Sequence, residues 1–227
     1  MFKHVLCDFD GTLVDSAHGI LVTIKKCIER AGLPVVVEPS RDLIGPPLRS
    51  MISAVIGSEH AAMMDIEKDF RTEYDERGYL LTVSYPGIPQ ALKDLHEGGI
   101  KLHLVTNKRL IPVRQILEQF GWDHYFQSVN TLDSTVGASS KSEVVALLLA
   151  RIDVPLNTVM IVGDTLDDWL AAQANGIGFA WASWGYGQDP ALRTSGQSLT
   201  GSEDFVRHVL RSQNMPTVSA ENPLSDR

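Results

Sequence analysis

Short apolar runs alternate along the chain with longer segments in which apolar residues recur at helical spacing. The apolar runs predict strands at Val5–Phe9, Leu102–Thr106, Phe126–Asn130, Val159–Val162 and Gly178–Trp181. The helical spacing predicts helices at Ile88–Glu97, Pro112–Phe120, Ser142–Arg151 and Asp168–Asn175. This alternation is typical of an α/β fold whose parallel sheet has helices on both faces. Functional groups of such folds gather at the carboxyl ends of the strands.

One part of the chain, residues 16–84, breaks the alternation because it contains only helical patterns. Helices are predicted at Ala17–Ala31, around Leu48–Ile56 and at His60–Gly78, with a loop at Val35–Val37 between two prolines. The chain would return to the core through the turn-forming Tyr85–Gly87. We therefore expect a core domain of residues 1–15 and 85–211 with a small helical domain, 16–84, inserted after the first strand. Residues 212–227 are polar and aperiodic, and we expect them to be disordered.

Composition narrows the class of protein. The 227 residues contain 44% hydrophobic residues and carry a net charge of −8, which is typical of a soluble globular protein. The chain has no basic block, so a nucleic acid polymer is not an expected partner. Cys7 and Cys27 form no disulfide framework, and neither a signal peptide nor a membrane span is evident, so we expect a cytoplasmic protein without membrane partners. A monomer and a homodimer both remain open.

Two acids, Asp8 and Asp10, lie at the end of the first predicted strand, just after the apolar run His4–Cys7, and precede Gly11 and Thr12. Residues i and i+2 of a strand share a side, so the two carboxylates repel each other unless a cation lies between them. A hard divalent ion suits such oxygen ligands. One carboxylate can then attack an electrophile while the other transfers protons. The competing interpretation is a turn that only caps the following helix.

Two further segments offer groups that bind phosphate. Thr106 ends the second predicted strand, and Asn107 and Lys108 follow it. A hydroxyl and an amide at this position can hold phosphate oxygens. The alternative is that Thr106 or Asn107 is an ordinary helix N-cap. Lys141 opens a predicted helix, where the helix dipole disfavours a cation. This placement favours a lysine that reaches toward phosphate and carboxylate oxygens, although a solvated surface lysine is the competing interpretation.

Another acidic cluster follows the strand at Val159–Val162. Asp164 stands at the strand end, and Asp167 and Asp168 follow in the loop and the first turn of the next helix. Helix capping accounts for one or two of these acids, but not for acids at the ends of two separate strands. Without a cation Asp8, Asp10 and Asp164 would repel one another. Mg²⁺ fits best, because it takes few protein carboxylates and keeps water or phosphate ligands.

The four motifs, in this order, resemble the haloacid dehalogenase superfamily: Asp8–Leu13, Val105–Asn107, Lys141, and Gly163–Asp164 with Asp168. The resemblance covers about residues 1–210. It implies a Rossmann-like parallel sheet core with a small α-helical cap domain inserted after the first strand. In its insertion between the first and second motifs, the chain resembles the subclass with a helical cap.

The resemblance also implies a role for each catalytic residue. Asp8 would be the nucleophile that forms an aspartyl-phosphate, and Asp10 would be the acid and base that protonates the leaving oxygen and activates water. Thr106 and Asn107 would bind the phosphoryl group, and Lys141 would neutralise charge. An acid at position 10 resembles the phosphatase branches rather than a true dehalogenase.

The same resemblance implies a Mg²⁺ site. The ligands would be Asp8, the backbone carbonyl of Asp10 and Asp164, with Asp168 close behind. Asp167 competes with Asp168 for that last place, and motif spacing favours Asp168.

Within this superfamily, the segments Leu43–Arg49, Thr106–Lys108 and Trp184–Gly187 look similar to phosphoglycolate phosphatases. We therefore expect Arg49 to face an anionic tail of the substrate, the alternative for its segment being a rigid interhelical turn. Gly11, Thr12 and Lys108 complete the expected substrate-binding residues. One departure is the motif Ser139–Ser140–Lys141–Ser142, which lacks the lysine-proline pair common in those phosphatases.

The sequence thus predicts a Mg²⁺-dependent phosphomonoesterase that hydrolyses a small phosphorylated metabolite, with phosphoglycolate as one candidate. A 5′-nucleotidase or a pyrophosphatase of the same fold is the alternative. A phosphomutase, which would need a sugar-binding cap motif, and a non-catalytic binding protein on the same scaffold are further alternatives.

Overall fold

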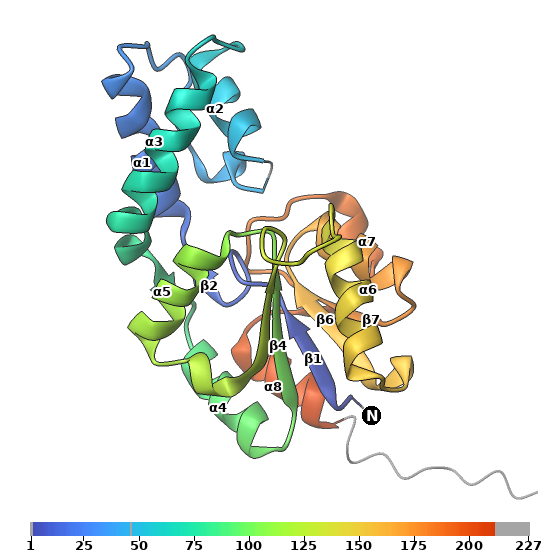
Figure 1. Cartoon of the computed structure of the whole chain (residues 1–227). Coiled ribbons are helices and arrows are strands. Elements are labelled where there is room, and N and C mark those ends of the chain that lie inside the picture. Colours follow the sequence, from blue (N-terminus) through green and yellow to red (C-terminus); the bar gives the residue numbers. More distant parts are fainter. Residues whose placement is uncertain (1, 46, 212–227) are drawn as a thin grey trace, which may run out of the picture.

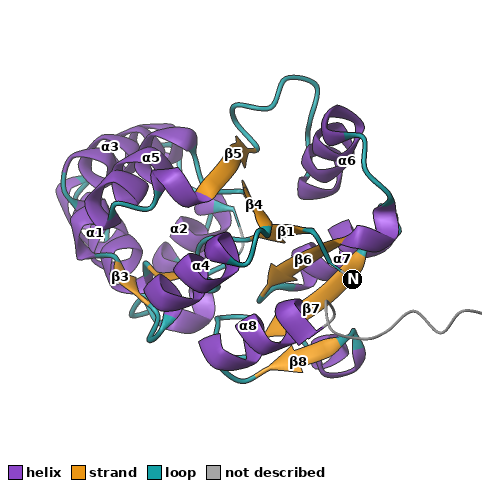
Figure 2. Cartoon of the chain, turned by 90° about the horizontal axis from the view of Figure 1, so that it is seen from below, coloured by secondary structure: helices purple, strands orange, loops and turns teal. Residues whose placement is uncertain are grey.

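In the residues that the computed structural model describes, 2–45 and 47–211, six parallel strands form the central sheet (Figures 1 and 2). Their order is β5-β4-β1-β6-β7-β8. The strands are β1 (His4–Cys7), β4 (Lys101–Thr106), β5 (Phe126–Thr131), β6 (Val159–Gly163), β7 (Gly178–Ala182) and β8 (Gln197–Leu199). Since β1 pairs with both β4 and β6, the carboxyl ends of these three strands lie side by side at the topological switch point.

Helices cover both faces of the sheet, so the predicted α/β architecture is confirmed (Figure 2). The apolar sides of α4 (Ile88–Glu97), α5 (Leu110–Phe120) and α8 (Ser202–Arg211) join one buried cluster with the strands. Those of α6 (Lys141–Ile152) and α7 (Leu166–Ala174) join a second cluster on the opposite face. Two buried layers therefore hold the strand ends that carry the candidate site.

The helical insertion (residues 16–84) follows the short strand β2 (Val14–Asp15) and ends with β3 (Val83–Ser84), and these two strands pair antiparallel with each other. It contains α1 (Ala17–Arg30), α2 (Leu48–Ile56) and α3 (Met63–Glu76), drawn in blue to teal in Figure 1. These helices bury their apolar sides in a cluster of their own, which includes Ile24, Ile52 and Phe70. The insertion therefore has its own hydrophobic core.

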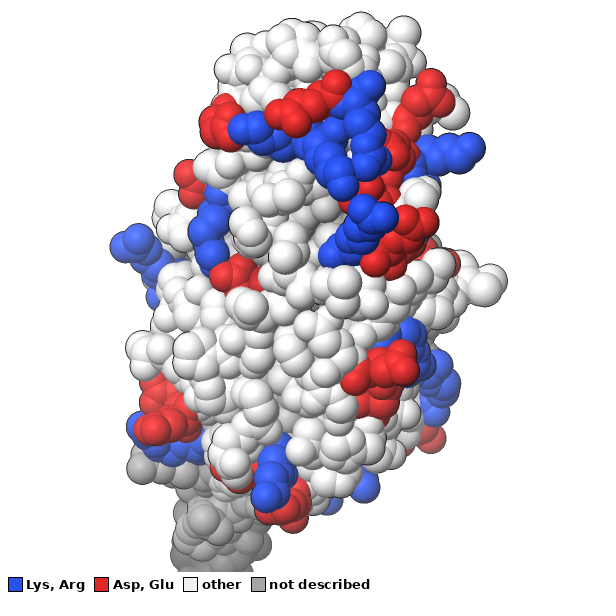
Figure 3. All heavy atoms as spheres, turned by 90° about the vertical axis from the view of Figure 1, so that its left-hand side faces the viewer, with Lys and Arg blue, Asp and Glu red and all other residues white. Residues whose placement is uncertain are grey.

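The outer face of the insertion carries paired charges. Glu73 of α3 accepts from Lys26 at 2.5 Å and from Arg30 at 2.6 Å, and Arg30 also reaches Asp69 at 3.1 Å. Figure 3 shows the lysine and arginine side chains of this face lying against acidic ones. These pairs join α1 to α3 through the buried Glu73, whereas the Arg30–Asp69 pair is exposed on both sides and adds little to stability.

Several boundaries differ from the sequence prediction. The first strand ends at Cys7 rather than at Phe9, because the Phe9 carbonyl accepts turn hydrogen bonds from the amides of Leu13 (2.9 Å) and Val14 (3.0 Å). The sequence analysis also predicted neither β8 nor α8. Strand β8 has only three residues, too few for a period, whereas α8 is amphipathic and has apolar residues such as Phe205 and Val209 at helical spacing. The predicted disordered tail, 212–227, lies outside the described residues.

Candidate active site

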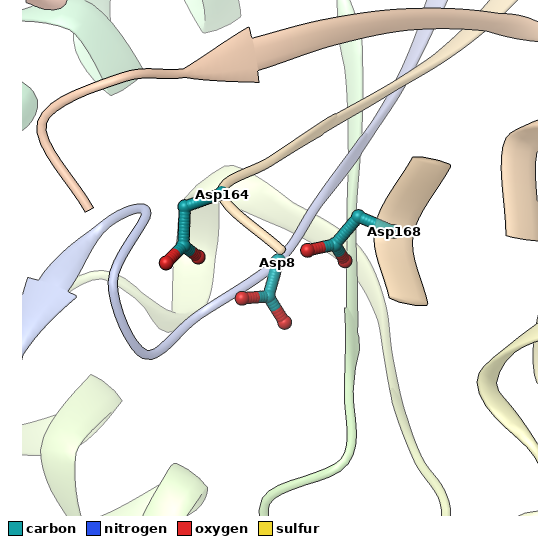
Figure 4. A group of neighbouring side chains, drawn as sticks. All are labelled: Asp8, Asp164 and Asp168. Carbon is teal, nitrogen blue, oxygen red and sulfur yellow. The ribbon is translucent and has the colours of Figure 1, made fainter. Parts of the chain in front are cut away.

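Three carboxylates from separate parts of the chain meet at the carboxyl ends of β1 and β6. Asp8 follows β1, Asp164 follows β6, and Asp168 stands in the first turn of α7 (Figure 4). Each offers one carboxylate oxygen, and these oxygens all lie within 4.8 Å of one another. All three residues are buried, with Asp8 the most accessible at 5% exposure. Three acids would not share so small a buried volume without positive charge nearby.

Lys141 supplies part of that charge from the first position of α6. Its Nζ donates to Asp8 Oδ1 and to Asp168 Oδ1, both at 2.6 Å. Burial lowers the pKa of Lys141, but the charges of Asp168 and Asp8 outweigh it and hold the pKa above its ordinary value. The lysine is therefore an ammonium ion that bridges two of the three acids.

The cluster still has an excess of negative charge. Burial raises the pKa of Asp8 well above its ordinary value, and burial with the nearby Asp168 raises the pKa of Asp164 to about 7. Three carboxylates against one ammonium leave two negative charges when all three are ionised. A divalent cation with a preference for oxygen ligands would relieve this excess, so the donor set fits Mg²⁺.

Asp164 is held by a loop that sequence reasoning did not connect with it. Its Oδ1 accepts from Thr12 Oγ1 at 3.0 Å, and its Oδ2 accepts from the amides of Tyr186 at 2.7 Å and Gly187 at 3.3 Å. Gly11 has φ +88°, and a Cβ there would lie 2.3 Å from Asp164 Oδ2. The Thr12 side chain thus holds Asp164, and Gly11 allows Asp164 to approach closely. The expected binding of substrate by Gly11 and Thr12 stays a prediction.

Asp10 lies apart from the three-acid cluster and has a different set of partners. Ser16 Oγ donates to its Oδ1 at 2.5 Å, and Lys108 Nζ donates to its Oδ1 at 3.0 Å and its Oδ2 at 3.1 Å. Tyr74 of α3 accepts a further hydrogen bond from Lys108 at 2.9 Å. Sequence reasoning missed Ser16 and Tyr74. The spacing of Ser16 from Asp10 on the strand-to-helix turn is a local signal, whereas Tyr74 has none.

The second motif lies beside the same strand ends. Thr106 is buried, and its hydroxyl accepts from the Lys108 amide at 3.2 Å. Asn107 Nδ2 donates to Asp167 Oδ2 at 2.7 Å. Asp167 is therefore bonded to Asn107, while its neighbour Asp168 faces Asp8 and Asp164.

Two arginines of the helical insertion differ in what they contact. Arg49, the predicted substrate residue, donates to Glu67 at 2.8 Å and lies 3.9 Å from Glu59, both within the insertion. Arg41 reaches the core instead. It donates to Asp15 at 2.7 Å, and its guanidinium carbon lies 5.2 Å from the ring centroid of Tyr186. The role of Arg49 stays a prediction.

Comparison with known proteins shows what this chain is similar to. The profile of a family described as haloacid dehalogenase-like hydrolase matches residues 5–182. A phosphoglycolate phosphatase of Vibrio parahaemolyticus is 30% identical over 92% of this chain and 92% of its own. A 5′-nucleotidase of Pseudomonas aeruginosa is 27% identical over 85% of this chain and 87% of its own.

A third relative carries a different activity in its name. The tyrosine-protein kinase PtkA of Mycobacterium tuberculosis is 32% identical over 81% of this chain, and the match spans 63% of that protein. Its solved structure superposes with a TM-score of 0.78 at 28% identity, over 92% of this chain and 97% of that one. A haloacid dehalogenase-like protein of Streptococcus pneumoniae, 23% identical, has the same fold with a TM-score of 0.81 over 91% of this chain and 98% of its own.

Proposed function

We propose that this chain, which belongs to the haloacid dehalogenase-like hydrolase family, is a Mg²⁺-dependent phosphomonoesterase for a small phosphorylated metabolite. The observation that carries the proposal is the buried cluster of Asp8, Asp164 and Asp168, in which Lys141 pairs with Asp8 and Asp168. The phosphatases among its relatives, above all the phosphoglycolate phosphatase matched over 92% of both chains, support this class of reaction.

The geometry suggests how the reaction proceeds. Lys141 holds Asp8 Oδ1, so we assign the attack on phosphorus to Asp8 Oδ2. The bond from phosphorus to the leaving oxygen breaks, and that oxygen takes a proton from the carboxyl group of Asp10. Asp10 then accepts a proton from water, and the water oxygen attacks phosphorus, which releases phosphate and restores Asp8. Lys141 opposes the negative charge that gathers on the phosphoryl oxygens.

A magnesium ion held by Asp8, Asp164 and the backbone carbonyl of Asp10, with Asp168 beside it, would neutralise phosphoryl charge in this pocket. Thr106 and Asn107 are the proposed phosphoryl-binding groups at the end of β4. The helical insertion would act as a cap that limits water access to the reacting groups.

Buried, unpaired Cys7 and Cys27 suit a protein of the reducing cytoplasm.

Phosphoglycolate is the substrate we propose first. The 5′-nucleotidase relative supports nucleoside monophosphates as the second candidate. The test is a phosphate-release screen with 2-phosphoglycolate, nucleoside 5′-monophosphates, sugar phosphates and pyrophosphate. Each is assayed with Mg²⁺ and with EDTA, on wild-type protein and on Asp8→Asn.

We expect Mg²⁺-dependent phosphate release that EDTA and Asp8→Asn abolish. Turnover in EDTA, or by Asp8→Asn, would contradict the proposal. The same screen includes ATP with a tyrosine-containing peptide, because the PtkA relatives are named as kinases. Transfer of phosphate to that peptide without release of phosphate from any small substrate would contradict hydrolysis and favour phosphoryl transfer.

A further inference from the structure

Lys108 joins the core to the helical insertion at the active site. Its Nζ donates to both carboxylate oxygens of Asp10, at 3.0 and 3.1 Å, and to the hydroxyl of Tyr74 at 2.9 Å. The Nζ also lies 4.7 Å from the centroid of the Tyr74 ring. Tyr74 is 3% exposed and the Lys108 side chain 7%. The ammonium is thus enclosed by a core acid on one side and an aromatic residue of the insertion on the other.

The donors of Lys108 match the acceptors around it. An ammonium has three N–H donors, and the described acceptors are the two oxygens of Asp10 and the one hydroxyl of Tyr74. A buried ammonium that loses one of these partners is left with an unsatisfied donor, which carries a large penalty. Without the Tyr74 hydroxyl, the flexible lysine would therefore turn toward another acceptor and leave its place at Asp10.

The end of α3 is fixed firmly enough to place Tyr74. The next residue, Asp75, forms an ion pair with Arg109, and its backbone carbonyl accepts from Gln115 Nε2 at 2.8 Å. Phe70, one turn earlier on α3, stacks on the Tyr74 ring with 5.4 Å between centroids and 12° between planes. The ring therefore has little freedom, and its position depends on how the insertion is seated on the core.

We propose that Tyr74 is a positioning residue of the active site, which holds Lys108 against Asp10 when the helical insertion is seated on the core. This inference rests on the proposed function, in which Asp10 transfers protons. Tyr74 belongs to the insertion, whereas Lys108 and Asp10 belong to the core. Seating of the insertion and orientation of the acid are thus one event.

The test is Tyr74→Phe, which keeps the ring and removes the hydroxyl. We expect kcat for the best substrate of the screen to fall about tenfold, with KM changed less than about twofold. The matched control is Tyr79→Phe. Tyr79 lies in the same insertion and packs against both clusters, and in the described part of the chain no hydrogen bond joins it to Lys108 or Asp10. We expect the control to retain wild-type kcat.

A double-mutant cycle with Lys108→Met separates positioning from general cap packing. If Tyr74 acts through Lys108, Tyr74→Phe costs no further kcat in the Lys108→Met background. A wild-type kcat for Tyr74→Phe, or an equal loss with and without Lys108, overturns the inference.

An inactive wild-type protein would mean that the proposed function fails, and the inference then rests on the contact alone. The wild type, Tyr74→Phe, Lys108→Met and the double variant are therefore also unfolded in urea. Their free energies of unfolding measure the coupling between Tyr74 and Lys108 without any substrate. A clear coupling supports Tyr74 as the residue that holds Lys108, and additive losses of stability overturn that role.

Discussion

Thr12 has one described side-chain partner, the Oδ1 atom of Asp164, and it is fully buried. Partners of this kind orient a metal ligand, and their loss typically weakens metal affinity tenfold or more. We therefore predict that Thr12→Val, which keeps the shape and removes the hydroxyl, raises the Mg²⁺ concentration for half-maximal activity about tenfold. Thr12→Ser is the control and should stay near wild type. Calorimetric titration with Mg²⁺ measures the same change without a substrate.

Equal Mg²⁺ dependence of Thr12→Val and wild type would show that Asp164 needs no hydroxyl to hold it. The backbone amides of Tyr186 and Gly187 would then be sufficient.

At the scale of single residues, sequence motifs identified the acids and the lysine of the site. They did not identify the residues that donate hydrogen bonds to those acids. Asp8, Asp164, Asp168 and Lys141 follow strand ends or open helices, which are positions that a pattern can locate. The choice of Asp168 over Asp167 rested on motif spacing, and in the fold Asp168 lies near Asp8 and Asp164 while Asp167 is bonded to Asn107. Tyr186 could not be found in this way, since its amide meets Asp164 only through the fold of a loop.

Arg41 and Arg49 also show that a sequence motif does not reveal which contacts a side chain makes in the fold. Both are arginines of the insertion, eight residues apart, and the motif likeness favoured Arg49. In the fold Arg49 pairs with Glu67 and Arg41 crosses to Asp15 of the core. Which arginine reaches the core depends on the packing of α2 and of the loop before it, which no local pattern encodes.

At the scale of elements, α6 places Lys141 at its first residue, directly after the N-cap Ser140. The Ser140 hydroxyl accepts from the Glu143 amide at 3.3 Å, while the Glu143 carboxylate accepts from the Ser139 amide at 2.6 Å. An N-cap serine replaced by alanine typically costs about 1 kcal/mol. We predict that Ser140→Ala lowers the free energy of unfolding by about 1 kcal/mol in urea, and that Ser140→Thr lowers it by less.

The Ser140 N-cap should also affect activity, because it sets the start of the helix α6, whose first residue is Lys141. If Ser140→Ala keeps the full stability of the wild type, the N-cap contributes nothing and Lys141 is placed by its two ion pairs alone.

Elements with strong periodicity were predicted best. The strands that form the centre of the sheet have continuous apolar runs, and their existence and parallel arrangement followed from the sequence. The edge strand β8 was missed because three residues carry no period. The helix α8 is an exception, because its apolar residues, among them Phe205 and Val209, have helical spacing and the sequence pattern could have predicted it.

At the scale of the whole molecule, a buried histidine links three strands of the sheet. His103 of β4 lies 3.1 Å from His4 of β1 and 2.9 Å from Ser128 of β5 through its two ring nitrogens. Burial, with smaller contributions from His4 and Arg151, lowers the pKa of His103 to about 4. The folded state therefore keeps this ring neutral at pH values where the unfolded chain already protonates it.

The sign of the pH dependence follows from that difference. The unfolded pKa is about 6.5, so the stability from His103 is complete above that pH and is lost as the pH falls toward about 4. We predict that acidification from pH 7 to pH 5 lowers the Tm of the wild type more than that of His103→Gln. Parallel Tm curves for the two proteins would show that His103 does not titrate on unfolding.

The net charge of the chain bears on the proposed partner. In the described residues no helix is long and apolar enough to cross a membrane. The chain carries a net charge of −8, which does not favour a phosphate backbone as a partner. A small anionic metabolite remains the proposed partner, because Lys141, Lys108 and a divalent ion would offset its charge.

Phosphorylation of Asp8 is the central step of the proposed reaction. The direct measurement is rapid acid quenching of wild-type protein during turnover of the best substrate, followed by mass spectrometry of the peptide that contains Asp8. We expect one phosphoryl group on Asp8 at the earliest times, and none in Asp8→Asn. Phosphate release with no label on Asp8 within the first turnover, or a label on a different residue, would contradict the account.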